Sequence, residues 1–228
     1  MTPLQSPGTA EALESNVTLG AVDIQRRFAT PFLVTAIGNA ETMNAELRRV
    51  ILARAATDPG VKRSNNGGWQ SDDAFADWSG SAGETLLAIA RGVANTVTAL
   101  QTDDGLRQGG PDWKANAWAN VNRAGDGNYA HHHPAAFWSG VYWVDVGAGK
   151  DGETAGGEFE MHDPRGILPS FYAPRLRYAI PGCLSAGGQD FFTPSSGVMV
   201  LFPAWLVHAV RPYTGDGVRI SVAFNLSV

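Results

Sequence analysis

The chain has 228 residues, of which 44% are hydrophobic, so it can bury a substantial core as one domain spanning 1–228. Its 17 basic and 22 acidic side chains give a net charge of −5, which argues against a nucleic-acid partner, because neutralising phosphates requires clustered Lys and Arg. Cys183 is the only cysteine, so no intrachain disulfide can form, and a reducing, cytoplasmic location is expected.

The N-terminal region lacks the features of a targeting segment. Residues 1–20 are polar and contain prolines and a glycine, which predicts a flexible lead. They have neither a basic start nor an apolar centre, so no signal peptide is expected. The longest apolar stretch, residues 198–207, is about half as long as a membrane helix and contains Pro203. We therefore expect no membrane partner.

Residues 21–111 are predicted to be mainly helical support for the rest of the chain. Residues 22–37 mix β-branched and aromatic side chains and predict a first strand, interrupted at Pro31. Residues 40–56 show apolar side chains at helical spacing, and Asn39 is expected to cap the helix.

The next segment is predicted to be a long polar loop over 61–80, followed by a second helix over 81–100. Ser81 and Glu84 have the spacing of a capping box at the start of this helix. The loop at 61–80 and a later loop at 165–195 are expected to shape a pocket.

Short strands dominate from residue 112 to residue 228, where Gly, Pro, Asp and Ser separate β-branched and aromatic runs. The predicted strands cover residues 115–122, 137–146, 157–161, 197–202 and 218–227. Helices followed by a run of strands indicate an α+β protein, and the strand number and spacing are typical of a jelly roll or small barrel.

Three of the five histidines are consecutive, at positions 131–133. Alternate side chains of an extended strand share a face, so His131 and His133 can converge while His132 points away. Pro134 favours an extended His133, which supports that geometry. The run therefore predicts two metal ligands, although histidines of a loop or core are the alternative. Strand register also leaves open whether His132 replaces His131.

A third metal ligand must come from elsewhere in the chain, and His208, which follows an apolar strand, is the best candidate. The alternative for His208 is a hydrogen-bonded core histidine. His162 is a weaker candidate because Pro164 and Arg165 mark a turn, and Asp163 is a possible carboxylate ligand.

Arg219 and Ser221 lie on the same side of the last predicted strand, opposite its apolar side chains. A guanidinium and a hydroxyl that point inward together make a carboxylate site, whereas a solvent-facing Arg is the alternative. Asn120 and Asn122 precede the histidine run and are candidates to donate hydrogen bonds to a bound ligand. Ordinary polarity at a strand edge is their alternative.

A His-x-His segment, a distant His and then Arg-x-Ser resemble the Fe(II)/2-oxoglutarate oxygenase superfamily. The segments NYAHHHPAAFWSGVYWVDV, GGEFEMHDPR, VMVLFPAWLVHAVRPY and RISVAFN are similar to a bacterial and phage family of such oxygenases, as are FATPF and NNGGWQSDDAF. This resemblance covers most of residues 25–226. The superfamily has Asp or Glu where this chain has His133.

The resemblance implies a double-stranded β-helix, a cupin-like jelly roll with flanking N-terminal helices. It implies a dioxygenase that hydroxylates an unidentified small molecule or amino-acid side chain. The implied cofactors are Fe(II), held by His131, His133 and His208, and 2-oxoglutarate as cosubstrate. The residues implied to bind the cosubstrate are Arg219, Ser221, Asn120 and Asn122.

Other functions remain open at this point. A three-histidine cupin enzyme without 2-oxoglutarate, a zinc hydrolase or isomerase, and a non-enzymatic jelly-roll binding module all fit three histidines. The apolar excess makes a homodimer possible.

Overall fold

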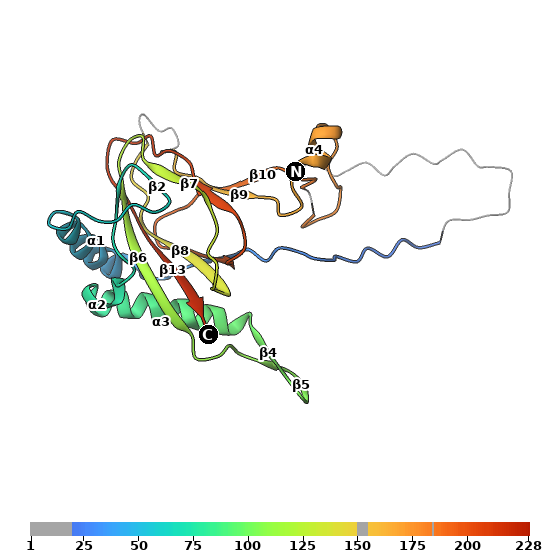
Figure 1. Ribbon diagram of the computed structural model, residues 1–228, viewed down its shortest axis with the longest axis horizontal. Coiled ribbons are helices and arrows are strands. Elements are labelled where there is room, and N and C mark those ends of the chain that lie inside the picture. The colour runs from blue at the N-terminus through green and yellow to red at the C-terminus, as the bar shows by residue number, and fades with distance from the viewer. Residues whose placement is uncertain (1–19, 150–154, 184) are drawn as a thin grey trace.

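The computed structural model describes residues 20–149, 155–183 and 185–228, so nearly all of the predicted flexible lead lies outside the described residues. Two antiparallel β-sheets face each other, and helices cover the outer side of the larger sheet (Figure 1). This is the predicted α+β jelly roll with helices at its N-terminal end.

The two long helices lie close to their predicted positions, but their caps differ. Helix α1 spans Glu41–Ala55 and α3 spans Gly80–Thr96, with the short α2 at Phe75–Trp78. The N-cap residues are Ala40 and Ser79, and neither makes a side-chain capping hydrogen bond, so the caps predicted at Asn39 and Ser81 are wrong.

Helix α3 ends earlier than predicted because the chain turns into a two-stranded hairpin. Strand β4, Ala99–Thr102, pairs with β5, Gly105–Gln108, and this hairpin extends beyond the end of α3 (Figure 1). Among the described residues, no helix is long and apolar enough to cross a membrane.

The larger sheet has six strands in the order β1-β11-β8-β13-β6-β3. Their bounds are Leu33–Ala36 for β1, Val198–Pro203 for β11, Trp138–Asp145 for β8, Arg219–Ser227 for β13, Lys114–Asn122 for β6 and Trp69–Gln70 for β3. The strand predicted over 22–37 thus contracts to β1.

The smaller sheet has five strands in the order β10-β9-β12-β7-β2. Their bounds are Gln189–Phe192 for β10, Phe159–His162 for β9, His208–Val210 for β12, Gly127–His131 for β7 and Asn65–Asn66 for β2. The short helix α4, Leu168–Tyr172, lies between β9 and β10. Because β2, β3 and α2 all fall within 61–80, that segment is more regular than the predicted loop.

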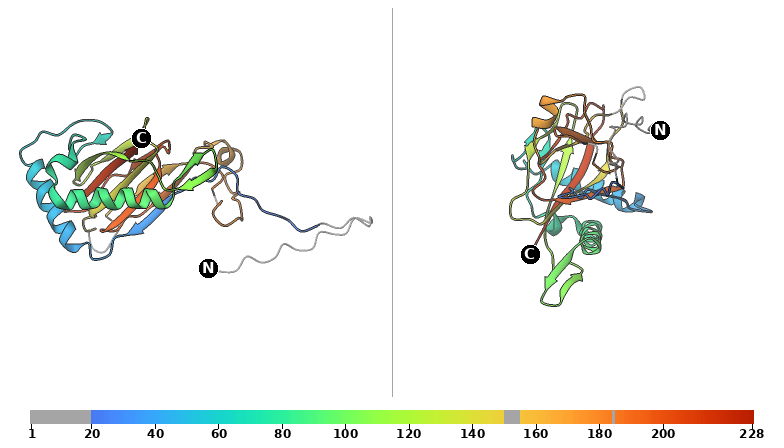
Figure 2. Two further views of the ribbon diagram at one scale, coloured as in Figure 1. Left: turned by 90° about the horizontal axis from the view of Figure 1, so that it is seen from below. Right: turned by 90° about the vertical axis from the view of Figure 1, so that its right-hand side faces the viewer.

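The helices pack on the outer face of the larger sheet and form the first of two cores. Helix α3 runs across this face (Figure 2), and its Leu86 and Leu87 are buried against apolar side chains of the sheet. Strand β13 contributes Ile220, Val222 and Phe224 from alternate positions, which confirms the apolar face predicted for this strand.

The second core lies between the two sheets. Trp143 and Phe202 from the larger sheet contact Phe159 from the smaller one, with ring centroids 5.1 to 6.3 Å apart. This aromatic layer fills part of the interior, and polar side chains line the rest. The interior of the jelly roll is therefore where a ligand site can form.

Replacing Leu86 by alanine should lower the free energy of unfolding by about 2–5 kcal/mol, because this side chain is fully buried between α3 and the sheet. Urea unfolding measures the change. Leu106→Ala in β5 is the matched control, since that leucine is 74% exposed and its loss should change the free energy by no more than about 0.5 kcal/mol. Equal effects of the two variants would contradict the packing described here.

Candidate metal centre

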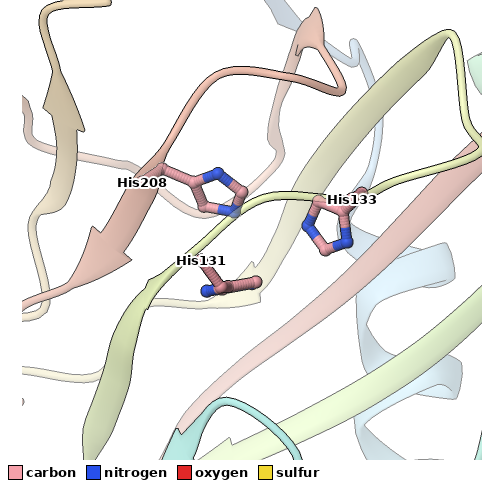
Figure 3. Close-up of side chains that lie close together, drawn as sticks. All are labelled: His131, His133 and His208. Atoms are coloured by element: carbon pink, nitrogen blue, oxygen red, sulfur yellow. The ribbon is translucent and has the colours of Figure 1, made fainter.

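Two neighbouring strands and one loop bring three histidines to the same place. His131 is the last residue of β7, His208 is the first residue of β12, and the antiparallel pairing sets them directly opposite each other. His133 follows β7, and its backbone N–H donates to the carbonyl of Ala204 at 2.9 Å. The three rings point toward a common spot (Figure 3).

The three rings are close enough to share one metal ion. One nitrogen from each ring lies within 4.8 Å of the others. The ring centroids are 4.4 Å apart for His131 and His208, 4.9 Å for His131 and His133, and 5.1 Å for His133 and His208. In the described part of the chain, no other group of His, Cys, Asp or Glu side chains converges in this way.

Backbone carbonyls fix the orientation of two of these rings. The Nδ1 of His131 lies 2.7 Å from the carbonyl oxygen of Tyr129, and the Nδ1 of His208 lies 2.8 Å from that of Leu206. A carbonyl only accepts, so Nδ1 must carry the proton in both rings. The Nε2 lone pairs are then free to bind a metal.

Burial keeps the three imidazoles neutral in the metal-free protein. It lowers the pKa of His208 to about 3 and that of His133 to about 4, and it also lowers the pKa of His131. Neighbouring histidines of the cluster lower these values further. A neutral imidazole is the form that binds a metal, so the cluster is ready for one at neutral pH.

The other candidate ligands lie outside this cluster. His132 is exposed and is not part of the cluster, as alternation predicts. His162 instead contacts Glu160 at 3.1 Å. Arg165 and Ser185 both donate to the Asp163 carboxylate at 2.6 Å, and the Arg165 hydrogen bond holds the pKa of that carboxyl well below its usual range. Asp163 is thus occupied by partners of its own.

Arg219 lies inside the jelly roll and is 2% exposed, which rules out the solvent-facing alternative. Its Nη2 donates to the Gly157 carbonyl at 3.1 Å, and its guanidinium lies 6.0 Å from the centre of the Trp143 ring. The buried Nε has no hydrogen-bond partner. Burial lowers the pKa of Arg219 to about 10, so the guanidinium remains charged at neutral pH.

Gly157 makes room for this arginine. Its φ of +73° is unfavourable for other residues, and a Cβ there would lie 2.8 Å from the Arg219 Nε. Any side chain at position 157 would therefore displace the guanidinium.

A narrow inner cavity joins the arginine to the histidines. Its volume of about 30 Å³ fits roughly two water molecules or one slim carboxylate. Among its lining residues are Asn120, Asn128, Arg219, Ser221 and the three clustered histidines. Asn122, predicted as a ligand contact, is also buried, but it is not part of the lining.

A larger outer cleft of about 600 Å³ opens on the other side of the histidines. His131, His133 and Trp118 line both spaces, so the cleft and the inner cavity meet at the cluster. Residues 61–73 supply much of its wall, which confirms the expectation that this segment shapes a pocket. Residues of the segment 165–195 line a separate cavity that lacks the three histidines, so this segment shapes a pocket other than the one at the cluster.

The donors in this site fit Fe(II) and a dicarboxylate. Three imidazoles on one side of a cavity suit Fe, Zn, Cu or Ni and leave positions open. The unpartnered Nε of a buried, charged arginine is unusual, because buried charges are normally fully hydrogen-bonded. A carboxylate in the inner cavity would supply the missing acceptor.

The model of one known family matches the β-rich part of the chain. Residues 116–225 match the model of a family described as "Putative 2OG-Fe(II) oxygenase". This span contains the histidine cluster and Arg219. Curated protein sequences give no match.

Solved structures share the fold at low sequence identity. A prolyl-4-hydroxylase from Pseudomonas putida is 14% identical with a TM-score of 0.56, over 86% of this chain and 91% of that one. HygX from Streptomyces hygroscopicus, solved with nickel and 2-oxoglutarate, is 13% identical with a TM-score of 0.54, over 87% and 83%. A prolyl hydroxylase from Trichoplax adhaerens, solved with a peptide, is 10% identical with a TM-score of 0.54, over 86% and 83%. These likenesses confirm the double-stranded β-helix.

The metal-free protein should lose stability as the pH falls below about 6.5, where histidines of the unfolded chain protonate. His133 and His208 take up protons in the folded protein only near pH 4 and pH 3, so the unfolded state binds more protons between these values and pH 6.5. Urea unfolding at pH 7 and pH 5 measures the loss. His208→Gln should reduce the loss of unfolding free energy between pH 7 and pH 5, whereas the exposed His132→Gln should leave that loss unchanged. Equal losses in the two variants would contradict this account.

Replacing His133 by aspartate should strengthen metal binding in the absence of a cosubstrate by about tenfold or more, because a carboxylate adds negative charge beside the ion. Titration with Co(II), followed by its visible absorption, measures the affinity. His132→Asp adds the same charge at an exposed position outside the cluster and is the matched control. An equal gain in both variants would show that position 133 does not contact the metal.

Proposed function

We propose that the chain, whose residues 116–225 match the 2OG-Fe(II) oxygenase family model, is a non-haem Fe(II), 2-oxoglutarate-dependent dioxygenase that hydroxylates a small molecule or an amino-acid side chain. One observation supports this proposal most strongly. A charged, fully buried arginine with an unpartnered Nε lies behind three neutral histidines whose ring nitrogens converge.

In this proposal His131, His133 and His208 hold Fe(II) through their ring nitrogens. Bound Fe(II) and 2-oxoglutarate supply the oxidation of a substrate C–H bond by O₂, with loss of CO₂ from the cosubstrate. The carbonyls of Tyr129 and Leu206 keep two of the imidazoles in the tautomer that leaves Nε2 unprotonated. The protein thus orients its ligands before the metal arrives.

The inner cavity would hold the far carboxylate of 2-oxoglutarate. Arg219 offers its Nε and a guanidinium fork, which pairs with a carboxylate through two parallel hydrogen bonds. Ser221 lies on the same face of β13 and lines the cavity, and Asn120 lines it from β6. The narrow cavity excludes bulk water around these donors, and this strengthens the attraction.

The rival functions do not explain why the charged Arg219 is buried behind the histidine cluster. A three-histidine cupin enzyme or a zinc hydrolase needs the histidine cluster but no buried cation behind it. A binding module without a metal does not need three converging imidazoles with free lone pairs. Burying an uncompensated charge costs stability, so a role in ligand binding is the simplest reason for it.

The remaining expectations about partners and place also belong to this proposal. The relative from Trichoplax adhaerens was solved with a peptide, so a peptide side chain is one possible substrate. The proposal also includes a cytoplasmic location, the lack of a nucleic-acid partner and a homodimer. The amino-acid composition of the chain supports these three points.

Arg219→Met should abolish 2-oxoglutarate binding while leaving the fold intact. Replacing a buried charge by an apolar side chain is often neutral or stabilising, so the free energy of unfolding should stay unchanged or rise by up to about 4 kcal/mol. The visible charge-transfer band of anaerobic protein with Fe(II) and 2-oxoglutarate measures binding, and urea unfolding measures stability.

Arg107→Met in the β4–β5 hairpin is the matched control, because this arginine is exposed and does not line the inner cavity. It should leave the band unchanged. If iron-loaded wild-type protein shows no band with 2-oxoglutarate, the proposed function is wrong.

A further inference from the structure

The wall of the outer cleft carries hydrogen-bond acceptors that no group of the protein satisfies. Gln70 on β3 lines the cleft and is 6% exposed, and its Oε1 has no hydrogen-bond partner. Gln70 pairs in register with Asn120 on β6, which lines the inner cavity instead, so β3 and β6 connect the two spaces. Buried polar atoms are nearly always hydrogen-bonded, so the unsatisfied Gln70 acceptor indicates that a ligand with hydrogen-bond donors belongs in this cleft.

Two carboxylates continue this acceptor surface toward solvent. Asp72 and Asp73 follow β3 after Ser71, line the cleft and are exposed. One oxygen of Asp72 accepts from the backbone N–H of Ala74 at 3.3 Å, whereas the Asp73 carboxylate has no hydrogen-bond or ion-pair partner among the described residues. Gln70, Asp72 and Asp73 thus give this part of the wall three acceptor side chains within four residues.

A single cation also lines the cleft. The guanidinium of Arg63 has no hydrogen-bond or ion-pair partner in the described part of the chain, so it lies beyond 4.0 Å from either aspartate. The cleft thus holds separated acidic and basic groups that do not neutralise each other. A ligand with charges of both signs would complement them.

We propose that the substrate is a basic amino acid whose cationic side chain binds Asp72, Asp73 and Gln70 and whose carboxylate binds Arg63. This inference rests on the proposed oxygenase function, because it makes the outer cleft the substrate site. A guanidinium has five donors and an ammonium has three, which matches a wall rich in acceptors. The volume of about 600 Å³ is within the range of small-molecule sites.

Strand β6 forms a wall that the outer cleft and the inner cavity share. This wall explains how such a substrate would reach the metal ligands. Asn116, Trp118 and Asn120 project from the same face of β6, since they occupy alternate positions of one strand. The Trp118 ring lies 5.5 Å from the His133 ring, centre to centre. A ligand that lies along this face contacts the histidine cluster at one end and the mouth of the cleft at the other.

Calorimetric titration of the full chain, loaded with Ni(II) and 2-oxoglutarate, tests the proposal. The probes are L-arginine and L-citrulline, which differ mainly in the charge of the side-chain end. L-Arginine should bind about tenfold or more tightly than L-citrulline. In Asp72→Asn/Asp73→Asn this preference should disappear, whereas Asp103→Asn/Asp104→Asn, which removes the same charge from the β4–β5 turn, should retain it.

A second pair of probes separates a free amino acid from a peptide side chain. Arg63→Gln should weaken binding of L-arginine about fivefold or more and leave the capped peptide N-acetyl-Ala-Arg-Ala-amide unaffected, because that peptide lacks the free carboxylate. If the peptide binds as tightly as L-arginine, the role assigned to Arg63 is overturned.

Failure of this inference can be told apart from failure of the proposed function. If 2-oxoglutarate binds but L-arginine and L-citrulline bind equally or not at all, the substrate assignment is wrong and the oxygenase function stands. If L-arginine retains its preference and 2-oxoglutarate does not bind, the cation site stands and the cosubstrate assignment is wrong.

Discussion

The site depends on the register between β12 and β7, because this register sets His208 opposite His131. Side chains directly opposite in an antiparallel pair lie close together, and a slip of one residue would turn His208 to the other face of the sheet. Strand β12 has only three residues, so it cannot hold this register alone. Its second neighbour β9 pairs His208 with Met161 and fixes the strand from the other side.

Arg219 shows the same dependence of the site on the whole fold. Strand β13 lies between β6 and β8 and is buried on both faces, with Ile220 and Val222 toward the helices and Arg219 toward the interior. A charge in this position costs stability unless a ligand or a protein group compensates it. The Trp143 ring and the Gly157 carbonyl compensate part of the charge, and a bound carboxylate would compensate the rest.

Local patterns were enough to predict the parts of the site that lie on one segment. The spacing of His131 and His133 and the alternation along β13 are local, and the structure has both. The burial of Arg219 could not be predicted from alternation, because both faces of β13 are covered. Gln70 was missed as well, since β3 is too short for a periodic signal and meets β6 only through a pairing between distant residues.

Charge is separated along the path from the inner cavity to the mouth of the cleft. The inner lining contains the Arg219 cation, three neutral imidazoles and no acidic side chain, so a divalent metal there would leave a positive region that a dianion can neutralise. The acidic side chains of the outer lining are Asp72 and Asp73, both on the far side of the histidines. The positive inner cavity would attract the anionic cosubstrate, and the acidic outer cleft would attract a cationic group of the substrate. Each region would also repel the ligand that belongs in the other region.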